Sequence, residues 1–353
     1  MTLRVAVLGA SGYGGAGLIE RLRAHPDAEL VAVASRQYLG RSVDAAWPHL
    51  AGLVPLAFVD SDDAIAAADV VMFATPHGAT AGLVRAARAA GKVVVDLSAD
   101  FRLDAATYAS WYGSHPHPEL LGEAVYGLPE LHRSELPGAA IVASPGCNAT
   151  AATLALAPLA AAGLLGDVPT VTIVTGASGA GRGLDLGLHF GELNENARPY
   201  KVAGTHRHTG EIEVTLGRLA AQGKDARSHG PRATLRLSFN PVLVPMNRGI
   251  IASAVARPGG AELDDAALLE RYRAFYADDP CVVVQEALPQ TKAVAGSDRA
   301  VIAVRWDHRT DSVVAMCAID NLGKGAAGQA VQGMNLALGL PETAGLRMEG
   351  QWP

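Results

Sequence analysis

A glycine-rich turn between an apolar run and a helical pattern is the feature that most constrains how this chain can fold. The run LRVAVLG at residues 3–9 predicts a buried strand, and GASGYGGAGL at 9–18 follows it at once. Apolar side chains then recur at helical spacing to about residue 25. Glycines in such a turn let a pyrophosphate approach the backbone amides at the start of a helix. The arrangement predicts the first βαβ unit of a dinucleotide-binding domain.

Further runs of Val, Ile and Ala follow within the first 146 residues, and helical patterns separate them. The runs are continuously apolar, as expected for parallel strands that are buried on both faces. Strands that alternate with helices indicate repeated βαβ units. The predicted strands lie at 29–35, 69–76, 92–98 and 139–146, and a predicted helix lies at 80–91. This part of the chain therefore predicts a Rossmann-type domain with a parallel sheet.

After residue 147 the predicted strands are longer and alternate between apolar and polar residues, which is typical of antiparallel sheets with one exposed face. They lie at 169–176, 233–245, 249–258, 300–307 and 312–320. The last two flank HRT, a connection short enough for an antiparallel hairpin. A helix is expected near 264–277, and a final helix at about 326–339 should return to the first domain.

The predicted fold class is α/β, with a Rossmann-type dinucleotide-binding domain and an inserted α+β domain that has a mostly antiparallel sheet. We place the dinucleotide-binding domain at residues 1–147 and 321–353, and the inserted domain at 148–320.

The composition excludes several classes of partner. The chain has 353 residues, of which 49% are apolar and 18% charged, with a net charge of −6. That balance argues against nucleic acid, because phosphate backbones are bound by clustered Lys and Arg. The weakly polar stretch at 149–166 is rich in alanine, which predicts a buried helix and no membrane span. The three cysteines form no CxxC pair, so no disulfide framework or metal cluster is expected, and a reducing cytoplasm fits.

The turn and the end of the second strand together indicate the cofactor. Gly9, Gly12 and Gly15 give G-x-x-G-x-x-G, a departure from the usual G-x-G-x-x-G spacing. A domain that binds NAD usually has an acidic residue after the second strand, but this chain has Ser35 and Arg36 there. A guanidinium and a hydroxyl can bind a 2′-phosphate, so NADP is favoured over NAD. The alternative is that Arg36 is a solvated surface residue.

Cys147 lies in SPGCNAT, between a Pro-Gly turn and an alanine-rich helical pattern. A helix start presents unpaired N–H groups and the positive end of the helix dipole, and both favour the thiolate. The thiolate is the nucleophilic form of cysteine. The alternative is a small buried residue that only packs well.

A catalytic thiol needs a proton carrier, and YKVAGTHRHTGEIE at 200–213 offers His206 and His208. On a strand, both histidines would face the same side. Glu211 and Glu213 are close enough in sequence to orient an imidazole. No third ligand has suitable spacing for a metal site. A pair of surface histidines is the alternative.

Two cations are candidates for binding an anionic substrate. Arg182 lies in the glycine-rich loop TGASGAGRG at 175–183, and Arg102 lies in DLSADFRL. Either arginine could equally form a structural ion pair.

With these motifs together, the chain resembles the N-acetyl-γ-glutamyl-phosphate reductase family over nearly its whole length. The resemblance rests on GASGYGG, DLSADFRL, YGLPEL, SPGCNAT, SGAGR, HFGELNENARPYKVAGTHRHTGEIE and DNLGKGAAGQAVQGMN. The wider group includes aspartate-semialdehyde dehydrogenase and, more distantly, glyceraldehyde-phosphate dehydrogenase. The resemblance implies NADPH-dependent reduction of a small acyl phosphate to a semialdehyde in arginine biosynthesis, through a thioester on the cysteine.

Position by position, the resemblance implies that Cys147 is the nucleophile and that His206 or His208 is the acid/base residue, with Tyr200 and Glu211 nearby. The residues implied to bind the cofactor are Gly9, Ser11, Gly12, Tyr13, Gly14, Ser35, Arg36, Ser178, Gly179 and Asn321. The candidates for substrate binding are Arg102, Asn148, Arg182 and Tyr200. Gly210 departs from the family, which usually has proline there, but this change removes no reacting group.

Other functions remain open from the sequence. A related reductase of the lysine pathway acts on a substrate carried by a small acidic protein, with the same chemistry. A Cys/His pair also suits a thiol hydrolase or acyltransferase, and a non-catalytic NADP sensor is a third alternative. We expect a homo-oligomer, either a dimer or a tetramer.

Overall fold

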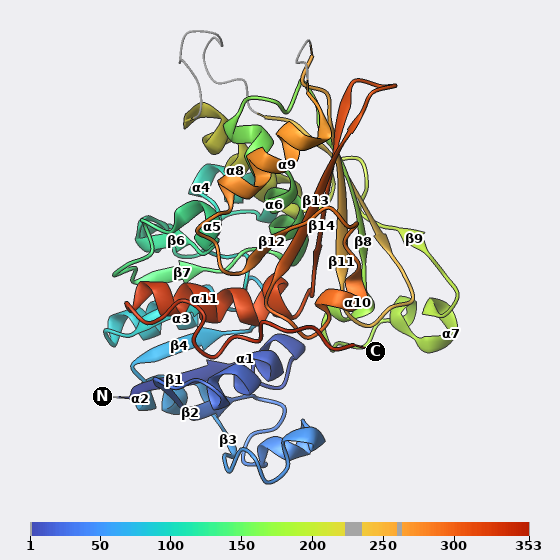
Figure 1. The fold of residues 1–353 in the computed structure, drawn as a ribbon. Helices are drawn as coiled ribbons and strands as arrows, with labels where there is room; N and C mark the ends of the chain where they lie inside the picture. The colour runs from blue at the N-terminus through green and yellow to red at the C-terminus, as the bar shows by residue number, and fades with distance from the viewer. Residues whose placement is uncertain (1, 223–234, 260–262, 353) are drawn as a thin grey trace. The chain divides into compact units, whose positions relative to one another are not determined.

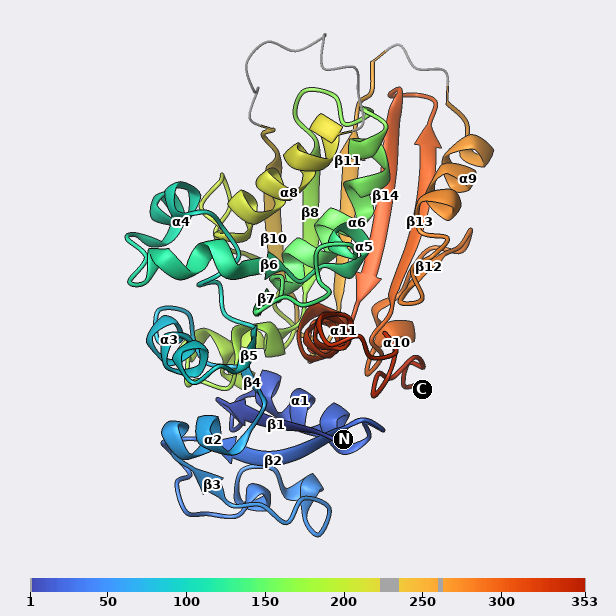
Figure 2. The same cartoon turned by 90° about the vertical axis from the view of Figure 1, so that its left-hand side faces the viewer.

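The computed structural model describes residues 2–222, 235–259 and 263–352. The chain divides into two compact units. Unit 1 contains Met1–Gly146 and Ala326–Arg347, and unit 2 contains Cys147–Gly325 and Met348–Pro353. Each unit is built on one seven-stranded sheet (Figures 1 and 2).

The sheet of unit 1 is parallel throughout, in the order β3-β2-β1-β4-β5-β7-β6. Its strands are β1 (Leu3–Leu8), β2 (Ala28–Ala34), β3 (Phe58–Val59), β4 (Val70–Phe73), β5 (Val93–Asp96), β6 (Ala124–Tyr126) and β7 (Ile141–Ala143). The strand order reverses between β1 and β4. In open α/β sheets, ligands bind at such a reversal, outside the carboxyl ends of the strands. The glycine-rich turn follows β1 and lies at this point.

Helices cover both faces of the unit 1 sheet, which explains why its strands are continuously apolar. On one face Leu18 of α1 and Met334 of α11 pack with Val7 of β1. On the other, Ile65 of α2 packs in a cluster with Leu8. The helices are α1 (Tyr13–Arg23), α2 (Ser61–Ala67), α3 (Ala81–Ala89), α4 (Ala105–Tyr112), α5 (Pro129–His132) and α11 (Gly328–Ala337), with short 3-10 helices at Val43–Ala45, Pro48–Leu50 and Pro118–Glu123.

The sheet of unit 2 is mixed and mostly antiparallel, in the order β12-β13-β14-β11-β8-β10-β9. The neighbours β12/β13 and β8/β10 are parallel, and the other neighbours are antiparallel. The strands are β8 (Thr170–Thr175), β9 (Arg198–Pro199), β10 (Ser238–Leu243), β11 (Ile250–Ala256), β12 (Val282–Val284), β13 (Ala300–Asp307) and β14 (Ser312–Ile319). The predicted fold class and the β13–β14 hairpin are confirmed.

The helices α6, α8 and α9 of unit 2 lie on one face of its sheet (Figures 1 and 2). There α6 contacts β8, β11, β13 and β14 and also packs against α8 and α9. The helices are α6 (Cys147–Ala161), α7 (Phe190–Leu193), α8 (His208–Gln222), α9 (Asp265–Phe275) and α10 (Thr291–Val294). Short 3-10 helices lie at Ala177–Ala180 and Leu186–Leu188, and a π-helical turn lies at Gly323–Ala327. Every residue of α6 from Asn148 to Ala160 is buried.

A proline inside α6 is compensated by a neighbouring helix. Pro158 has no N–H, so the carbonyl of Leu154 loses its helical donor. The hydroxyl of Tyr276, just after α9, donates to this carbonyl at 2.6 Å. The hydroxyl of Tyr272 donates to the carbonyl of Ala155 at 2.6 Å. The buried backbone of α6 therefore keeps its hydrogen bonds despite the proline.

Several strands are shorter than the sequence predicts. The strand predicted at 139–146 is Ile141–Ala143, because the segment before Cys147 turns at Pro145 and Gly146. The strand predicted at 233–245 begins at Ser238, and its residues 233–234 lie outside the described residues. The strands β3, β6, β9 and β12 were not predicted, since two or three residues show no hydrophobic period. None of the described helices combines the length and the apolar character that a membrane span requires.

The backbone at Gly9 predicts a local effect on stability. Gly9 has φ +76°, and a Cβ there would lie 2.5 Å from the carbonyl oxygen of Ala74. Gly40 has φ +75° but open space around its Cβ position. Gly40→Ala should therefore lose only about 1–2 kcal/mol, from the left-handed backbone. Gly9→Ala should lose clearly more, because the loop after β4 must also move, and urea unfolding of both variants measures the difference. Equal losses would show that the close approach of Ala74 is not what requires glycine.

Candidate active site

Cys147 is the cysteine that solvent can reach. It is half-buried at the first position of α6, whereas Cys281 and Cys317 are fully buried in the core. The thiol of Cys147 lies 3.9 Å from the side-chain oxygen of Asn148. The unpaired amides at the start of α6 favour its thiolate form. Cys147 is thus placed as a nucleophile needs to be, and the other two cysteines are core residues.

A glycine that the sequence analysis did not single out lies against Cys147. A Cβ at Gly325 would lie 2.9 Å from the Cβ of Cys147 and 3.1 Å from the carbonyl oxygen of Asp320. Gly325 belongs to the π-helical turn Gly323–Ala327, in the DNLGKGAAG segment. Any larger residue at this position would displace the cysteine. Only the glycine-rich character of that segment could have signalled this contact.

Tyr200 reaches the start of α6 from a distant part of the sequence. The side-chain amide of Asn148 donates to the hydroxyl of Tyr200 at 3.3 Å. Burial raises the pKa of Tyr200 to about 12, and the charge of Cys147 adds to this, while the bond from Asn148 acts in the opposite direction. Tyr200 therefore keeps its proton at neutral pH and can donate a hydrogen bond beside the thiol.

The two histidines meet, but not on a strand. His206 lies in a turn, and His208 is the first residue of α8. Their rings are 4.8 Å apart, nearly perpendicular. The strand on which both would face the same side does not form, because Lys201 and Ala203 adopt left-handed φ angles of 44° and 55° and break the extended backbone.

His206 is buried and neutral. Its ring lies 5.6 Å from that of Tyr200 and 5.2 Å from that of Phe239. Burial lowers the pKa of His206 to about 3, with further lowering from His208 and Lys201 and an opposing effect from Glu211. The backbone amide of His208 donates to Nδ1 of His206 at 3.1 Å. Nδ1 is therefore the acceptor, and we assign the proton of the neutral ring to Nε2.

The two glutamates expected near the histidines have different surroundings. Glu211 is buried in the first turn of α8, close enough to His206 to influence its pKa. Glu213 accepts from the backbone amide of Leu237 at 3.2 Å and pairs with Arg236 at 3.2 Å. Glu213 thus ties α8 to the segment before β10, which corrects the expectation that it orients an imidazole.

A second polar group of unit 2 contains Ser178 and Asn321. The amide of Asn321 donates to the hydroxyl of Ser178 at 2.9 Å, and its oxygen accepts from the backbone of Gly249 at 2.8 Å. Ser178 donates to the carbonyl of Asn247 at 2.6 Å. Gly179 lies beside Asn321, and Arg182 is exposed a few residues further on. The structure therefore joins Ser178, Gly179 and Asn321 in one rigid group.

The residues of the nucleotide turn fit a dinucleotide phosphate. The hydroxyls of Ser11 and Ser35 are 2.8 Å apart, which joins the turn to the end of β2. Gly12 is the N-cap of α1, and its side-chain-free backbone leaves the first amides of the helix open. Gly14 meets only ordinary contacts, from Ala74 and Leu97. Arg36 is exposed just after β2, where a ribose phosphate could reach it.

An aromatic support of this turn was missed by the sequence analysis. The ring of Tyr13, at the start of α1, lies 6.1 Å from the ring of Trp47. The indole N–H of Trp47 donates to the carbonyl of Ala10 at 2.9 Å. Trp47 lies in a loop, and no pattern in the sequence marks it.

Arg102 has a structural use within unit 1. Its Nε donates to the carbonyl of Ser144 at 2.7 Å and its Nη2 to the carbonyl of Leu97 at 2.7 Å. Asp96, at the end of β5, is fully buried, and this burial raises its pKa to about 7. Arg102 thus joins the chain after β5 to the chain after β7 through two backbone carbonyls.

Asp100 was also missed, although it lies in the DLSADFRL motif. Its buried carboxylate accepts from the backbone amides of Gly78 at 2.9 Å and Ala81 at 3.3 Å, and from the hydroxyl of Tyr108 at 3.1 Å. These bonds fix the loop after β4, which borders the nucleotide turn at Gly9. Asp100 therefore orders a loop that lies beside the strand reversal.

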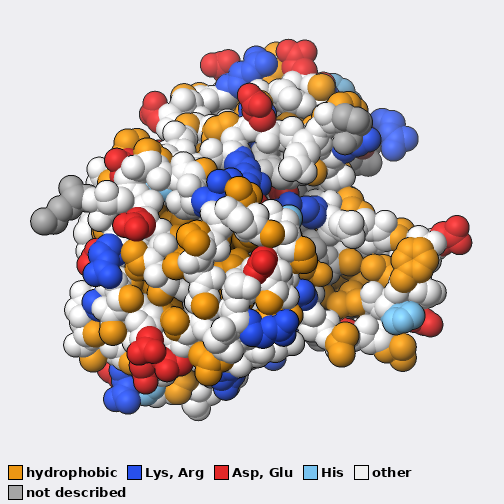
Figure 3. Space-filling view, turned by 90° about the horizontal axis from the view of Figure 1, so that it is seen from below, with side chains coloured by type: hydrophobic (Ala, Val, Ile, Leu, Met, Phe, Trp, Pro, Cys, Tyr) orange, Lys and Arg blue, Asp and Glu red, His pale blue; other side chains and the backbone are white. Residues whose placement is uncertain are grey.

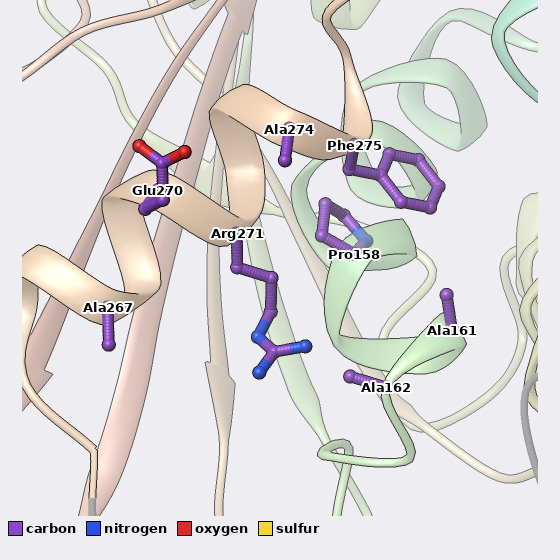
Figure 4. A pocket seen from close by; sticks show the side chains of 8 residues that line it. All are labelled: Pro158, Ala161, Ala162, Ala267, Glu270, Arg271, Ala274 and Phe275. Atoms are coloured by element: carbon purple, nitrogen blue, oxygen red, sulfur yellow. The ribbon is translucent and has the colours of Figure 1, made fainter.

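A groove on unit 2 lies apart from these residues. It is formed by α6 and α9 and is lined by Pro158, Ala161, Ala162, Ala267, Glu270, Arg271, Ala274 and Phe275 (Figure 4). It contains none of the predicted site residues. Among the described residues, no cluster of three His, Cys, Asp or Glu side chains could hold a metal ion.

Comparisons with known proteins agree with both units. The model of the semialdehyde dehydrogenase NAD binding domain matches residues 4–139, and that of the semialdehyde dehydrogenase dimerisation domain matches residues 147–321. The chain is 51% identical over 351 residues to the N-acetyl-gamma-glutamyl-phosphate reductase of Thermus thermophilus, covering 99% of this chain and 100% of the relative. The protein of the same name from Symbiobacterium thermophilum is 47% identical, covering 99% of each chain.

Solved structures show the same fold at low sequence identity. Aspartate semialdehyde dehydrogenase II from Vibrio cholerae, complexed with ASA, superimposes with a TM-score of 0.70 at 17% identity, covering 95% of this chain and 98% of that one. Aspartate semialdehyde dehydrogenase with NADP from Candida albicans gives a TM-score of 0.65 at 16% identity, covering 95% and 100%.

The burial of His206 predicts how stability depends on pH. The unfolded chain protonates this histidine near its ordinary pKa of 6.5, whereas the folded protein does so only near 3. Between these values the unfolded state binds the extra proton, so the folded protein loses stability as the pH falls, by at most about 1.4 kcal/mol per pH unit. His206→Asn should remove this loss. The difference in unfolding free energy between wild type and variant should therefore shrink from pH 6.5 to pH 4.

Asp96 has a raised pKa, so its contribution to stability grows as the pH falls. Because Asp96 is present in both wild type and variant, this contribution cancels in the difference. Chemical denaturation at several pH values makes the measurement. Parallel curves of unfolding free energy against pH would mean that burial does not lower the pKa of His206.

Proposed function

This chain belongs to the N-acetyl-gamma-glutamyl-phosphate reductase family of the semialdehyde dehydrogenases, and we propose that it reduces N-acetyl-L-glutamyl 5-phosphate to N-acetyl-L-glutamate 5-semialdehyde and phosphate, with NADPH, in arginine biosynthesis. The observation that carries the proposal is the reachable thiol of Cys147 at a helix start, beside Asn148 and Tyr200. An oxidoreductase acting through a thioester needs such a thiol. The three free cysteines suit the reducing cytoplasm, where we place the enzyme.

The thiolate of Cys147 attacks the acyl carbon of the substrate and forms a thioester, while the bond to phosphate breaks. NADPH, when bound, supplies the hydride that reduces this thioester. The protonated hydroxyl of Tyr200 and the amides at the start of α6 donate to the substrate oxygen as it gains negative charge. Cys147 leaves again as a thiolate when the aldehyde forms, which the same helix start favours.

His208 is the better candidate for moving the proton. Nδ1 of His206 already accepts from the backbone, and its buried ring resists protonation, so His206 serves as a hydrogen-bond donor through Nε2. His208 is only half-buried at the start of α8. We assign to His208 the removal of the thiol proton and its delivery to the departing phosphate.

The family resemblance assigns cofactor binding to two sets of residues, one in each unit. Gly9, Ser11, Gly12, Tyr13 and Gly14 form the turn for the pyrophosphate. Ser35 and Arg36 bind the 2′-phosphate, since no acidic residue follows β2 to repel it. The rigid group of Ser178, Gly179 and Asn321 borders the nicotinamide in this proposal.

The small acetylated substrate is favoured over one linked to a carrier protein. Glu192 and Glu195 are exposed in the segment that leads to Tyr200, and Arg198 nearby donates to the carbonyl of Gly187. An acidic carrier would be better received by an exposed cluster of Lys and Arg. A relative that is 51% identical carries the name of the acetylated substrate's enzyme.

Arg36→Ala should raise the Michaelis constant for NADPH far more than that for NADH. A charge-assisted bond to phosphate contributes about 1.5–3 kcal/mol to binding. NADH has no 2′-phosphate, so its binding does not depend on this bond. Arg41→Ala is the control, because Arg41 is nearby but lies over the ring of Tyr38. Equal effects of Arg36→Ala on both cofactors would remove Arg36 from the phosphate site.

The reverse reaction tests the proposed function directly. N-acetylglutamate semialdehyde, phosphate and NADP⁺ should give NADPH at a rate that depends on phosphate, because phosphate must release the thioester. Cys147→Ser should lose nearly all of this activity, since a serine hydroxyl ionises far less readily than a thiol. His208→Asn should lose on the order of 10²–10⁴ in turnover.

Cys317→Ser is the matched control, because Cys317 is a core residue of the same unit and should be dispensable for turnover. Near-normal turnover of Cys147→Ser would contradict the covalent mechanism. A carrier-linked glutamate or aminoadipate semialdehyde serves as the competing substrate. Much higher catalytic efficiency with that compound would reverse the ranking of substrates and leave the role of Cys147 intact.

A further inference from the structure

Arg248 is a cation of unit 2 that no motif of the sequence singles out. It lies between β10 and β11, and its side chain is 30% exposed. Its Nε donates to the carboxylate of Asp320 and lies 3.3 Å from Oδ1 and 3.1 Å from Oδ2. Within the described part of the chain, Nε is the atom of this guanidinium that makes hydrogen bonds. Both terminal nitrogens, with four N–H groups, are therefore available to a ligand.

The carboxylate that holds Arg248 is itself firmly fixed. Asp320 follows β14 and is fully buried. It accepts from the backbone amides of Gly296, Leu322 and Gly323. Three amide donors satisfy most of the hydrogen-bonding capacity of this carboxylate without the arginine. The ion pair therefore also serves the arginine, because a planar guanidinium that is bonded through Nε presents its remaining donors in one direction.

The backbone on either side of Arg248 is held as well. The carbonyl of Asn247 accepts from the amide of Ser178 at 3.1 Å and from its hydroxyl at 2.6 Å. The amide of Gly249 donates to the side-chain oxygen of Asn321 at 2.8 Å. Arg248 is thus fixed through its neighbours and through its own side chain. A group held in this way can bind a ligand with little further loss of conformational entropy.

Arg248 lies at the same end of the unit 2 sheet as Cys147. The first residue of β11 pairs with the last residue of β14, so Arg248 and Asp320 flank these two strands at one end. Gly325 connects this end with the thiol residue. A Cβ there would lie 2.9 Å from the Cβ of Cys147 and 3.1 Å from the carbonyl oxygen of Asp320. The guanidinium and the nucleophile therefore belong to one neighbourhood within one unit.

The charge of the chain makes a single well-placed arginine important. The net charge is −6, and Figure 3 shows Lys and Arg side chains in small separate groups on the face that it draws. Arg102, one of the two cations that the sequence singles out, uses Nε and Nη2 on backbone carbonyls of unit 1. An anionic substrate is then recognised through individual guanidinium groups, not through a broad basic surface.

We propose that Arg248 binds an anionic oxygen group of the substrate next to Cys147, either the phosphate or the carboxylate, through its two terminal nitrogens. This inference rests on the proposed function, which supplies a substrate that carries both groups. A guanidinium can donate two parallel hydrogen bonds to either group. An anion bound there keeps the acyl carbon within reach of the thiol. Asp320 is then a positioning residue, which orients Arg248 and does not touch the substrate.

The reverse reaction separates the two groups, because phosphate and the semialdehyde enter it as different reactants. Arg248→Ala should raise the Michaelis constant for one of them at least about tenfold, since charge-assisted hydrogen bonds are lost. A raised constant for phosphate identifies the phosphate as the bound group. A raised constant for the semialdehyde identifies its carboxylate. Arg273→Ala is the matched control, because Arg273 forms an exposed ion pair with Glu286 in the same unit and should keep both constants.

A second measurement needs no turnover. Iodoacetamide should alkylate Cys147, whereas Cys281 and Cys317 are buried in the folded core. Inorganic phosphate or N-acetyl-L-glutamate should slow the alkylation of Cys147, measured by mass spectrometry, more than chloride does at equal ionic strength. In Arg248→Ala, the concentration of the protecting anion that halves the rate should rise at least about tenfold.

A fall in kcat with unchanged Michaelis constants for phosphate and the semialdehyde would overturn the anion site and leave Arg248 as a structural partner of Asp320. Equal protection of Cys147 in wild type and variant would overturn it too, as would protection by chloride that matches both anions. If wild type lacked turnover, the proposed function would fail, yet the protection of Cys147 would still decide the anion site.

The buried cysteines report whether the variant is folded. If Cys281 or Cys317 of Arg248→Ala reacts with iodoacetamide, Arg248→Gln replaces it in both measurements. The glutamine amide can still donate to Asp320 but carries no charge. The same rise in the Michaelis constant and the same loss of protection are expected of it, and their absence would overturn the anion site.

Discussion

The burial of α6 between its two ends is the constraint on which unit 2 depends. Its side chains from Asn148 to Ala160 are mostly alanine, threonine and leucine, and all of them are buried. Small side chains let the sheet and the helices α8 and α9 approach closely, so that the helix position is fixed by packing in all directions. The hydroxyls of Tyr272 and Tyr276 complete its backbone bonds. Cys147 is the first residue of this rigid element, and its thiol is therefore held in one place.

Two neutral groups lie near the start of α6: Tyr200 accepts from Asn148, and the ring of His206 lies 5.6 Å from that of Tyr200. Tyr200 has a raised pKa and His206 a lowered one, and in both cases burial is the largest cause. Burial thus keeps the phenol protonated and the imidazole neutral. Such groups stabilise a developing oxyanion without first having to give up a charge or a hydration shell. The geometry suits acyl chemistry on a thioester, in which charge appears on one oxygen and then disappears.

Motifs predicted the local structure well where it depends on residues close in sequence. The nucleotide turn leads into α1 and Cys147 begins α6, as the sequence predicts. His206 lies in a turn, and His208 is the first residue of α8. Contacts between distant segments were not predictable. Gly325 against Cys147, Trp47 under the nucleotide turn and Asp100 on the loop after β4 leave no periodic signal, because each depends on where another segment passes.

The sequence by itself determined the two kinds of sheet and the helix that begins at Cys147. It could do so because hydrophobic period and turn residues act over a few neighbouring positions. Only the tertiary structure decided the order of the strands and the protonation states of Tyr200 and His206. It also decided the structural uses of Arg102 and Glu213. Burial and partner atoms set these properties, and both come from residues far away in the chain.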